Sequence, residues 1–289
     1  MKINTIRNQS ISISVAANGA ELRSLRRNAD MHEWMWQANA EYWPRTAPVL
    51  FPIVGKLNEN IYRHGSDFFP MSQHGFARDM EFNLIDSGDD FLIYRLDSNE
   101  QTLRIYPFHF SLEIEYRLID SSLEVFYRVV NQGKQDMYFS IGAHPGFSLE
   151  GWPAKKYFLE FEKDEKLSTM RLQDGLIADG GGNDIELQNR RIEITKDLFL
   201  KDALVFEGLH SSWLGIFQEG NSNGLRFNFS GFPFLGIWSK PGAPFVCIEP
   251  WYGHADPFGF EADISTKPGI VKLQEGASFS CDYSIEVLN

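Results

Sequence analysis

Three short segments of this chain place acid–base side chains beside turn-forming residues. His74 lies in the segment QHGFAR and His144 in GAHPGF, so a glycine follows one histidine and a proline follows the other. Glu249 follows the apolar run FVCI and precedes a proline. Because glycine and proline favour turns, we expect both imidazoles at strand ends or turns that a ligand can reach. Two imidazoles and one carboxylate are sufficient to move protons between oxygen atoms near neutral pH.

Glu249 is the most unusual acid of the chain. The run before it is apolar enough to be a buried strand, and the following proline is expected to end the hydrogen-bonded ladder. A carboxylate there would be partly desolvated, which raises its pKa and suits a general base. The alternative is an ion pair with Arg45 or Arg78, which would lower the pKa. Each histidine alone is equally compatible with a structural hydrogen bond, and His254 could border the same cleft.

Three reaction classes fit this set of residues. Two histidines and a carboxylate can bind a metal ion, but the chain has no HxH or HxxxH spacing that places two histidines on one face. A glycosidase could use Asp202 and Glu249 as its acid pair, which leaves both histidines without a role. Acid–base opening of a sugar hemiacetal uses a carboxylate and an imidazole directly and needs no cofactor or metal.

Composition limits the partners of the protein. The chain has 289 residues, of which 43% are hydrophobic, and a formal net charge of -12. A large core is therefore possible, whereas nucleic acid and anionic membranes are not expected partners. The N-terminal residues MKINTIR lack the apolar stretch of a signal peptide. Cys247 and Cys281 lie in strand-like runs and are expected to be reduced core residues. We expect a cytoplasmic monomer or homodimer that binds a small molecule.

Hydrophobic residues alternate with polar ones along most of the chain, which predicts β-strands. Two pairs of runs, 111–119 with 123–130 and 81–86 with 91–96, are typical of hairpins. Turn residues recur every eight to twelve positions or so, which favours a single all-β domain over 1–289, an antiparallel β-sandwich. The proline-containing stretch 42–60 is expected to be an irregular buried connection. The glycine-rich stretch 174–184 is expected to be a long loop.

Four motifs in order give the chain a specific resemblance. They are Arg45 with the following LFPIVG, then HGFAR, GAHPGF and IEPW. Together they resemble the aldose 1-epimerase (galactose mutarotase-like) family, and in particular its LacX-like branch, over nearly the whole chain. The resemblance implies a large twisted β-supersandwich, a cleft on one sheet face and mutarotation of a hexose without a cofactor.

The resemblance also implies roles for individual residues. Glu249 corresponds to the general base and His144 to the general acid. His74 and Arg45 correspond to residues that bind and orient the sugar, and Asp202 to an aspartate that binds a sugar hydroxyl. The chain has AHPGF where the galactose-specific branch has an Asn-His pair followed by Tyr-Phe-Asn, so a preference for galactose is not implied.

Two further residues bear on the substrate. Arg78, in HGFAR, matches an arginine that holds phosphate in the hexose-6-phosphate branch, and guanidinium groups suit phosphate binding. A local ion pair with Asp79 or Glu81 is the alternative for Arg78. Trp251 is the best candidate for an aromatic residue that stacks on a sugar. A hexose-6-phosphate epimerase and a non-catalytic sugar-binding module of the same fold are therefore the alternatives to a free-sugar epimerase.

Overall fold

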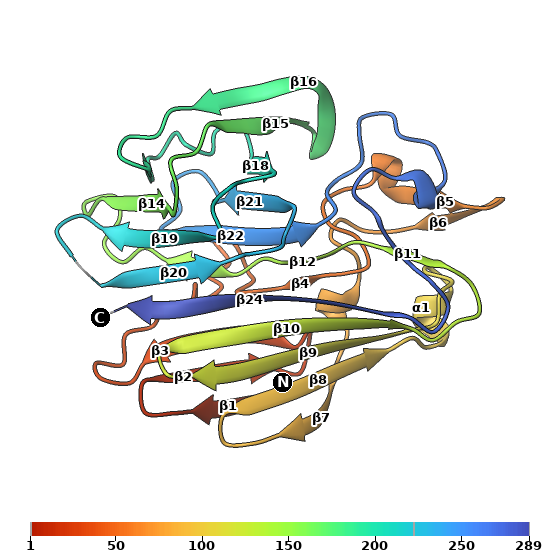
Figure 1. The fold of residues 1–289 in the computed structure, drawn as a ribbon, viewed down its shortest axis with the longest axis horizontal. Helices are drawn as coiled ribbons and strands as arrows, with labels where there is room; N and C mark the ends of the chain where they lie inside the picture. The colour runs from red at the N-terminus through yellow and green to blue at the C-terminus, as the bar shows by residue number, and fades with distance from the viewer. Residues whose placement is uncertain (1, 222, 289) are drawn as a thin grey trace.

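The computed structural model describes residues 2–221 and 223–288, and its ladders between strands are antiparallel (Figure 1). The largest sheet has nine strands, in the spatial order β17 (Arg191–Glu193), β14 (Tyr157–Phe161), β19 (Trp213–Gln218), β20 (Gly224–Asn228), β24 (Ser278–Leu288), β10 (Ser122–Asn131), β9 (Phe110–Ile119), β8 (Phe91–Asp97) and β7 (Asn83–Ser87). A six-stranded sheet has the order β18 (Leu204–Glu207), β21 (Phe234–Trp238), β22 (Phe245–Tyr252), β12 (Ile141–Ala143) and β4 (Val49–Leu50), and β13 (Gly146–Ser148) also pairs with β22.

Smaller elements complete the molecule. One sheet consists of β1 (Ile3–Arg7), β2 (Ile11–Ala16) and β3 (Glu21–Arg27), and three strand pairs are β5 (Ile61–His64) with β6 (Asp67–Pro70), β11 (Met137–Phe139) with β23 (Val271–Leu273), and β15 (Leu167–Gln173) with β16 (Leu176–Ile185). The helices are α1 (Glu100–Leu103) and the 3₁₀ turns η1 (Asn58–Asn60), η2 (Ala77–Asp79) and η3 (Ile264–Thr266). No helix of the described residues is long and apolar enough to cross a bilayer.

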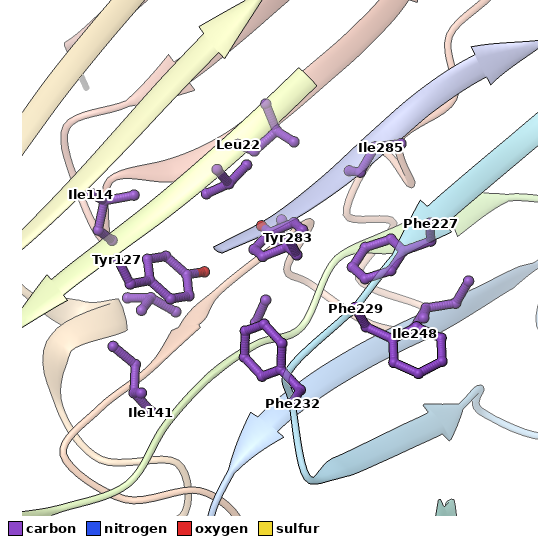
Figure 2. Close-up of a cluster of buried hydrophobic side chains, with 14 of the residues drawn as sticks. Leu22, Ile114, Tyr127, Ile141, Phe227, Phe229, Phe232, Ile248, Tyr283 and Ile285 are labelled. Carbon is purple, nitrogen blue, oxygen red and sulfur yellow. The ribbon is translucent and has the colours of Figure 1, made fainter. Parts of the chain in front are cut away.

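The main core lies between the nine-stranded and six-stranded sheets. Figure 2 shows Ile141 of β12 and Ile248 of β22 beside Tyr127, Phe227 and Tyr283 of the larger sheet. All five side chains are buried in one cluster. Period-2 alternation directs one side of each strand into this cluster. The predicted all-β sandwich is therefore confirmed.

The local predictions are mostly confirmed. The hairpins of β9 with β10 and of β7 with β8 form where the alternation predicted them, and both cysteines are free and buried. The stretch 42–60 contains only the two-residue strand β4 and η1. The prediction of a loop over 174–184 is wrong, because β16 pairs there with β15. The ladder contains register shifts between Ser168 and Leu172, so bulges interrupt the alternation that would have indicated a strand.

Candidate active site

The candidate site is built on one face of β22, a strand of the six-stranded sheet. Val246 and Ile248 belong to the main core, so the alternating residues Cys247, Glu249 and Trp251 face the other side of the sheet. The prediction that Glu249 ends the strand is wrong, since β22 continues to Tyr252. The predicted burial of Glu249 is confirmed, because only 2% of the residue is exposed.

A break in the neighbouring strand explains why the proline after Glu249 is tolerated. β13 pairs with β22 as far as Cys247 and β12 pairs with Trp251 and Tyr252, which leaves a gap between them. The Ile248 N–H reaches the Pro145 carbonyl on this side, at 3.2 Å. Residues two apart direct their N–H groups to the same side, so the missing N–H of Pro250 faces the gap.

The same break brings His144 to Glu249. His144 lies in the turn between β12 and β13, as its neighbouring proline predicted, and its Nε2 is 3.2 Å from Glu249 Oε2. Burial raises the pKa of Glu249 well above its usual value, and the nearby Asp202 carboxylate adds to the increase. Burial lowers the pKa of His144 to about 3. Both shifts favour a neutral pair, in which the carboxyl holds the proton and the imidazole is uncharged.

Aromatic rings surround His144. Trp43 stacks on the imidazole with ring centroids 4.8 Å apart and an interplanar angle of 25°, and Trp238 approaches edge-on at 5.8 Å. His74 lies edge-on at 5.6 Å. The Nδ1 atom of His144 is buried and has no hydrogen-bond partner among the described residues. In the neutral pair Nε2 accepts the carboxyl proton, so Nδ1 carries the proton of the ring.

His74 lies in a turn that is docked on the irregular segment before η1. It has a positive φ of 66°, and its backbone N–H donates to the Gly55 carbonyl. In return the Gly55 N–H donates to His74 Nδ1, at 3.1 Å. Because Nδ1 accepts this bond, Nε2 carries the proton of the neutral ring. Burial lowers the pKa of His74 well below its usual value, and the positive charges of Arg78 and Arg45 act in the same direction.

Trp251 occupies space that two glycines leave open. A Cβ on Gly142 of β12 or on Gly236 of β21 would lie 2.5 Å from its indole ring. The ring therefore fits between the strands on both sides of β22, and its side chain lines the cleft. That it stacks on a sugar stays a prediction. Trp251 Nε1 is buried and has no hydrogen-bond partner among the described residues.

Asp202 reaches the site from the start of β18, two strands away from β22. It lines the cleft, has a φ of 86°, and its Oδ1 accepts the N–H of Ala203 at 2.7 Å. The residue is exposed, and its charge is close enough to raise the pKa of Glu249. The resemblance implies that Asp202 binds a sugar hydroxyl, and the order β18-β21-β22 brings the residue to the cleft.

The two arginines differ in position. Arg78 lines the cleft, its Nη2 donates to the Gln73 carbonyl at 2.6 Å, and its Nε is 3.8 Å from Asp79. Arg45 is not among the residues that line the cleft, and its Nη2 forms a 2.6 Å ion pair with Asp79. Its charge still lowers the pKa of His74, so a role in orienting the sugar stays a prediction. Neither arginine forms an ion pair with Glu249 in the described structure.

Together these residues enclose a cleft of about 360 Å³. It unites Glu249, His144, His74, Asp202, Arg78 and Trp251 with Trp43 and Trp238, two further aromatic residues that could stack on a sugar. Gln73 and Leu172, which the sequence did not single out, also line it. His254, which could border the cleft on the basis of its closeness to Glu249, does so. The β15–β16 hairpin forms part of the wall. A buried imidazole–carboxyl pair that faces an aromatic-lined cleft has the chemistry to exchange protons with a small ligand.

Comparisons with known proteins place the chain among carbohydrate epimerases. The family model described as aldose 1-epimerase matches residues 2–280. The chain is 30% identical to the chromosomal protein LacX of Lactococcus lactis subsp. lactis, over 98% of this chain and 99% of that protein. It is similar to a galactose mutarotase related enzyme from Lactobacillus acidophilus, with a TM-score of 0.93, 31% identity and coverage of 100% and 98%. A galactose mutarotase-like protein from Lactobacillus casei gives a TM-score of 0.91 at 31% identity, with coverage of 99% and 100%.

The chain therefore belongs to the aldose 1-epimerase family. This confirms the resemblance that the four ordered motifs indicated.

Proposed function

We propose that this protein is an aldose 1-epimerase that interconverts the α and β anomers of a hexose by acid–base ring opening and reclosure. The observation that carries the proposal is the 3.2 Å contact between His144 Nε2 and Glu249 Oε2 in the cleft. Mutarotation requires one group to accept the proton of the anomeric hydroxyl while another supplies a proton to the ring oxygen. A coupled pair that holds one proton can do both.

The two groups exchange roles during one turnover. Transfer of the shared proton from Glu249 to His144 gives the carboxylate and imidazolium that ring opening uses. Glu249 then accepts the proton of the anomeric hydroxyl, and His144 donates one to the ring oxygen. The bond next to the aldehyde rotates, and closure reverses both proton transfers on the other face of the carbonyl. The pair carries one proton before and after the cycle, so no cofactor is needed to balance it.

The remaining cleft residues bind and orient the sugar in this mechanism. His74 Nε2–H donates to a sugar oxygen in place of its 3.3 Å contact with the Gln73 side-chain amide, because its Nδ1 is already bound to Gly55. The Asp202 carboxylate accepts from sugar hydroxyls, and the Trp43, Trp238 and Trp251 rings contact the apolar face of the sugar. Fixed donors beside the ring oxygen stabilise the charge that develops there.

A free hexose is the first candidate substrate. Arg78 is the one Arg or Lys side chain among the described residues that line the cleft, and its Nη2 already donates to the Gln73 carbonyl. A hexose 6-phosphate is the second candidate, because Arg78 Nε is buried without a hydrogen-bond partner among the described residues. A phosphate oxygen would satisfy that N–H.

Polarimetry on freshly dissolved α-glucose and α-galactose, and an anomer-specific coupled assay on their 6-phosphates, test the proposal. Glu249→Gln is expected to reduce the enzymatic rate by about 10²–10⁴-fold, since the amide cannot accept the proton. Glu165→Gln is the matched control, because Glu165 is also buried but does not line the cleft. A Glu249→Gln protein with near wild-type rate would contradict the role of the base.

The assay also separates the catalytic protein from a sugar-binding module. If the wild-type protein binds these sugars by calorimetry but accelerates none of them, the cleft serves binding only. If it neither binds nor accelerates them, the sugar assignment itself is wrong.

A further inference from the structure

A third potential metal ligand lies beside the acid–base pair. Cys247 is two residues before Glu249 on β22, so both side chains face the same side of the six-stranded sheet. One ligand atom each from Cys247, His144 and Glu249 lie within 4.8 Å of one another, and all three residues are buried. The mechanism proposed above uses two of these groups and gives the thiol no part.

The donor set selects a particular class of ligand. A thiol sulfur, an imidazole nitrogen and a carboxylate oxygen are the three protein ligands of zinc, whereas magnesium and calcium prefer oxygen alone. Zinc–ligand distances of about 2.0–2.3 Å place the ligands of a tetrahedral ion roughly 3.3–3.8 Å apart. His144 Nε2 and Glu249 Oε2 are close to this separation at 3.2 Å, and the Cys247 sulfur would have to approach by up to about 1 Å.

No two histidines have a spacing that places both on one face of a strand or helix, but a cysteine and a glutamate do. In a strand, ligands on one face are two residues apart, and CxE at 247–249 has this spacing. His144 is brought to the same place by the break between β12 and β13. Because His144 and Glu249 line the cleft, an ion can enter from it, and the cleft leaves a position for water or a sugar oxygen.

We propose that Cys247, His144 and Glu249 form a binding site for a thiophilic divalent cation such as Zn²⁺, and that an ion bound there inhibits the enzyme. Inhibition follows because the ion takes the lone pairs of the imidazole and the carboxylate, which must accept protons during ring opening. The inhibitory part rests on the proposed mutarotation, whereas the binding part does not.

Binding is tested first, without activity. Co²⁺ is added to the reduced wild-type protein, and the thiolate-to-cobalt charge-transfer absorption is recorded, followed by displacement with Zn²⁺. Cys247→Ser and Cys247→Ala are expected to lose this absorption, and Zn²⁺ affinity measured against a chromophoric chelator is expected to fall at least tenfold. Even a change at a residue that only hydrogen-bonds a metal ligand costs about 10–100-fold in metal affinity. Cys281→Ser is the matched control, because Cys281 is the other buried free thiol and lies on β24.

Inhibition is tested on the same proteins. Zn²⁺ is expected to inhibit mutarotation by the wild-type and Cys281→Ser proteins, and a chelator is expected to restore their activity. Each Cys247 variant is expected to need at least tenfold more Zn²⁺ for the same fractional inhibition, measured relative to its own zinc-free rate. A wild-type protein without the cobalt–thiolate band, or Cys247 variants that bind Zn²⁺ as tightly as the wild type, would overturn the proposal. Binding by a protein that has no mutarotase activity would overturn the proposed function and leave the metal site standing.

Discussion

At the scale of single residues, the site is governed by the proton that His144 and Glu249 share. Burial lowers the pKa of the imidazole and raises the pKa of the carboxyl, so the unliganded pair is neutral. In the proposed mechanism, the carboxylate and the imidazolium arise by moving that proton over a 3.2 Å contact. Burial therefore keeps one transferable proton on the pair over a wide pH range. Only with one such proton does the pair contain both a proton donor and a proton acceptor.

This predicts an unusually flat acid limb in the pH profile of kcat/KM. The pair gains a second proton at His144, whose pKa is lowered to about 3, so activity should persist well below the ordinary histidine pKa near 6.5. The pair loses its proton only above the raised pKa of Glu249. We expect kcat/KM at pH 5.5 to be within about twofold of its value at pH 7. The measurement is polarimetry with the uncatalysed rate subtracted at each pH, and a limb with an apparent pKa near 6.5 would contradict the prediction.

The sequence indicates which side chains of the cleft could transfer protons, but not which residues pack around them. His74, His144 and Glu249 are recognisable because glycine, proline and an apolar run flank them. Trp43 contacts His144 across about a hundred positions of sequence, and nothing in the chain nearby indicates that contact. Cys247 was predicted to be a core residue, which is confirmed, but its proximity to His144 depends on a strand break that alternation does not reveal.

At the scale of elements, a buried ion pair connects the cleft wall to η3. Lys267 Nζ is 2.9 Å from Asp256 Oδ1, and the two side chains are 1% and 3% exposed. The same ammonium donates to the His254 carbonyl at 2.7 Å, and Asp256 Oδ2 accepts the N–H of Asn58 at 2.9 Å. The wall segment that carries His254 is thereby tied to both η1 and η3. Because Asp256 and Lys267 lie in a segment without regular strands, neither periodicity nor spacing predicts this pair.

We expect Lys267→Met to destabilise the protein by about 3–5 kcal/mol, because it leaves the Asp256 carboxylate buried without its counter-charge. Urea unfolding followed by tryptophan fluorescence measures the loss. The double variant Lys267→Met/Asp256→Asn should recover part of it, since the uncompensated charge is gone. Lys272→Met is the matched control, because its ion pair with Asp136 lies on the surface and its removal should cost far less. Equal losses in the two single variants would contradict this account.

At the scale of the whole molecule, the two-sheet sandwich could be predicted because alternation and turn spacing recur throughout the chain. The placement of the cleft could not, since it depends on the order β18-β21-β22-β12-β4, which assembles segments from opposite ends of the sequence. The net charge of -12 is a second property of the whole molecule. Its field acts on charged ligands over roughly a Debye length, about 8–10 Å near physiological salt, and has little effect on neutral ones.

The charge gives a prediction that distinguishes the two candidate substrates. A free hexose is neutral, so its kcat/KM should change by less than about twofold between low salt and roughly 0.5 M salt. A hexose 6-phosphate is an anion, and the acidic molecule repels it at long range. Salt screens this repulsion, so it should raise kcat/KM for the phosphate if the repulsion exceeds the attraction of Arg78. Initial rates at both ionic strengths, with the uncatalysed rate subtracted, measure the effect. A strong salt dependence with glucose or galactose would mean that salt acts on the charges of the cleft itself, and would contradict the neutral pair of His144 and Glu249.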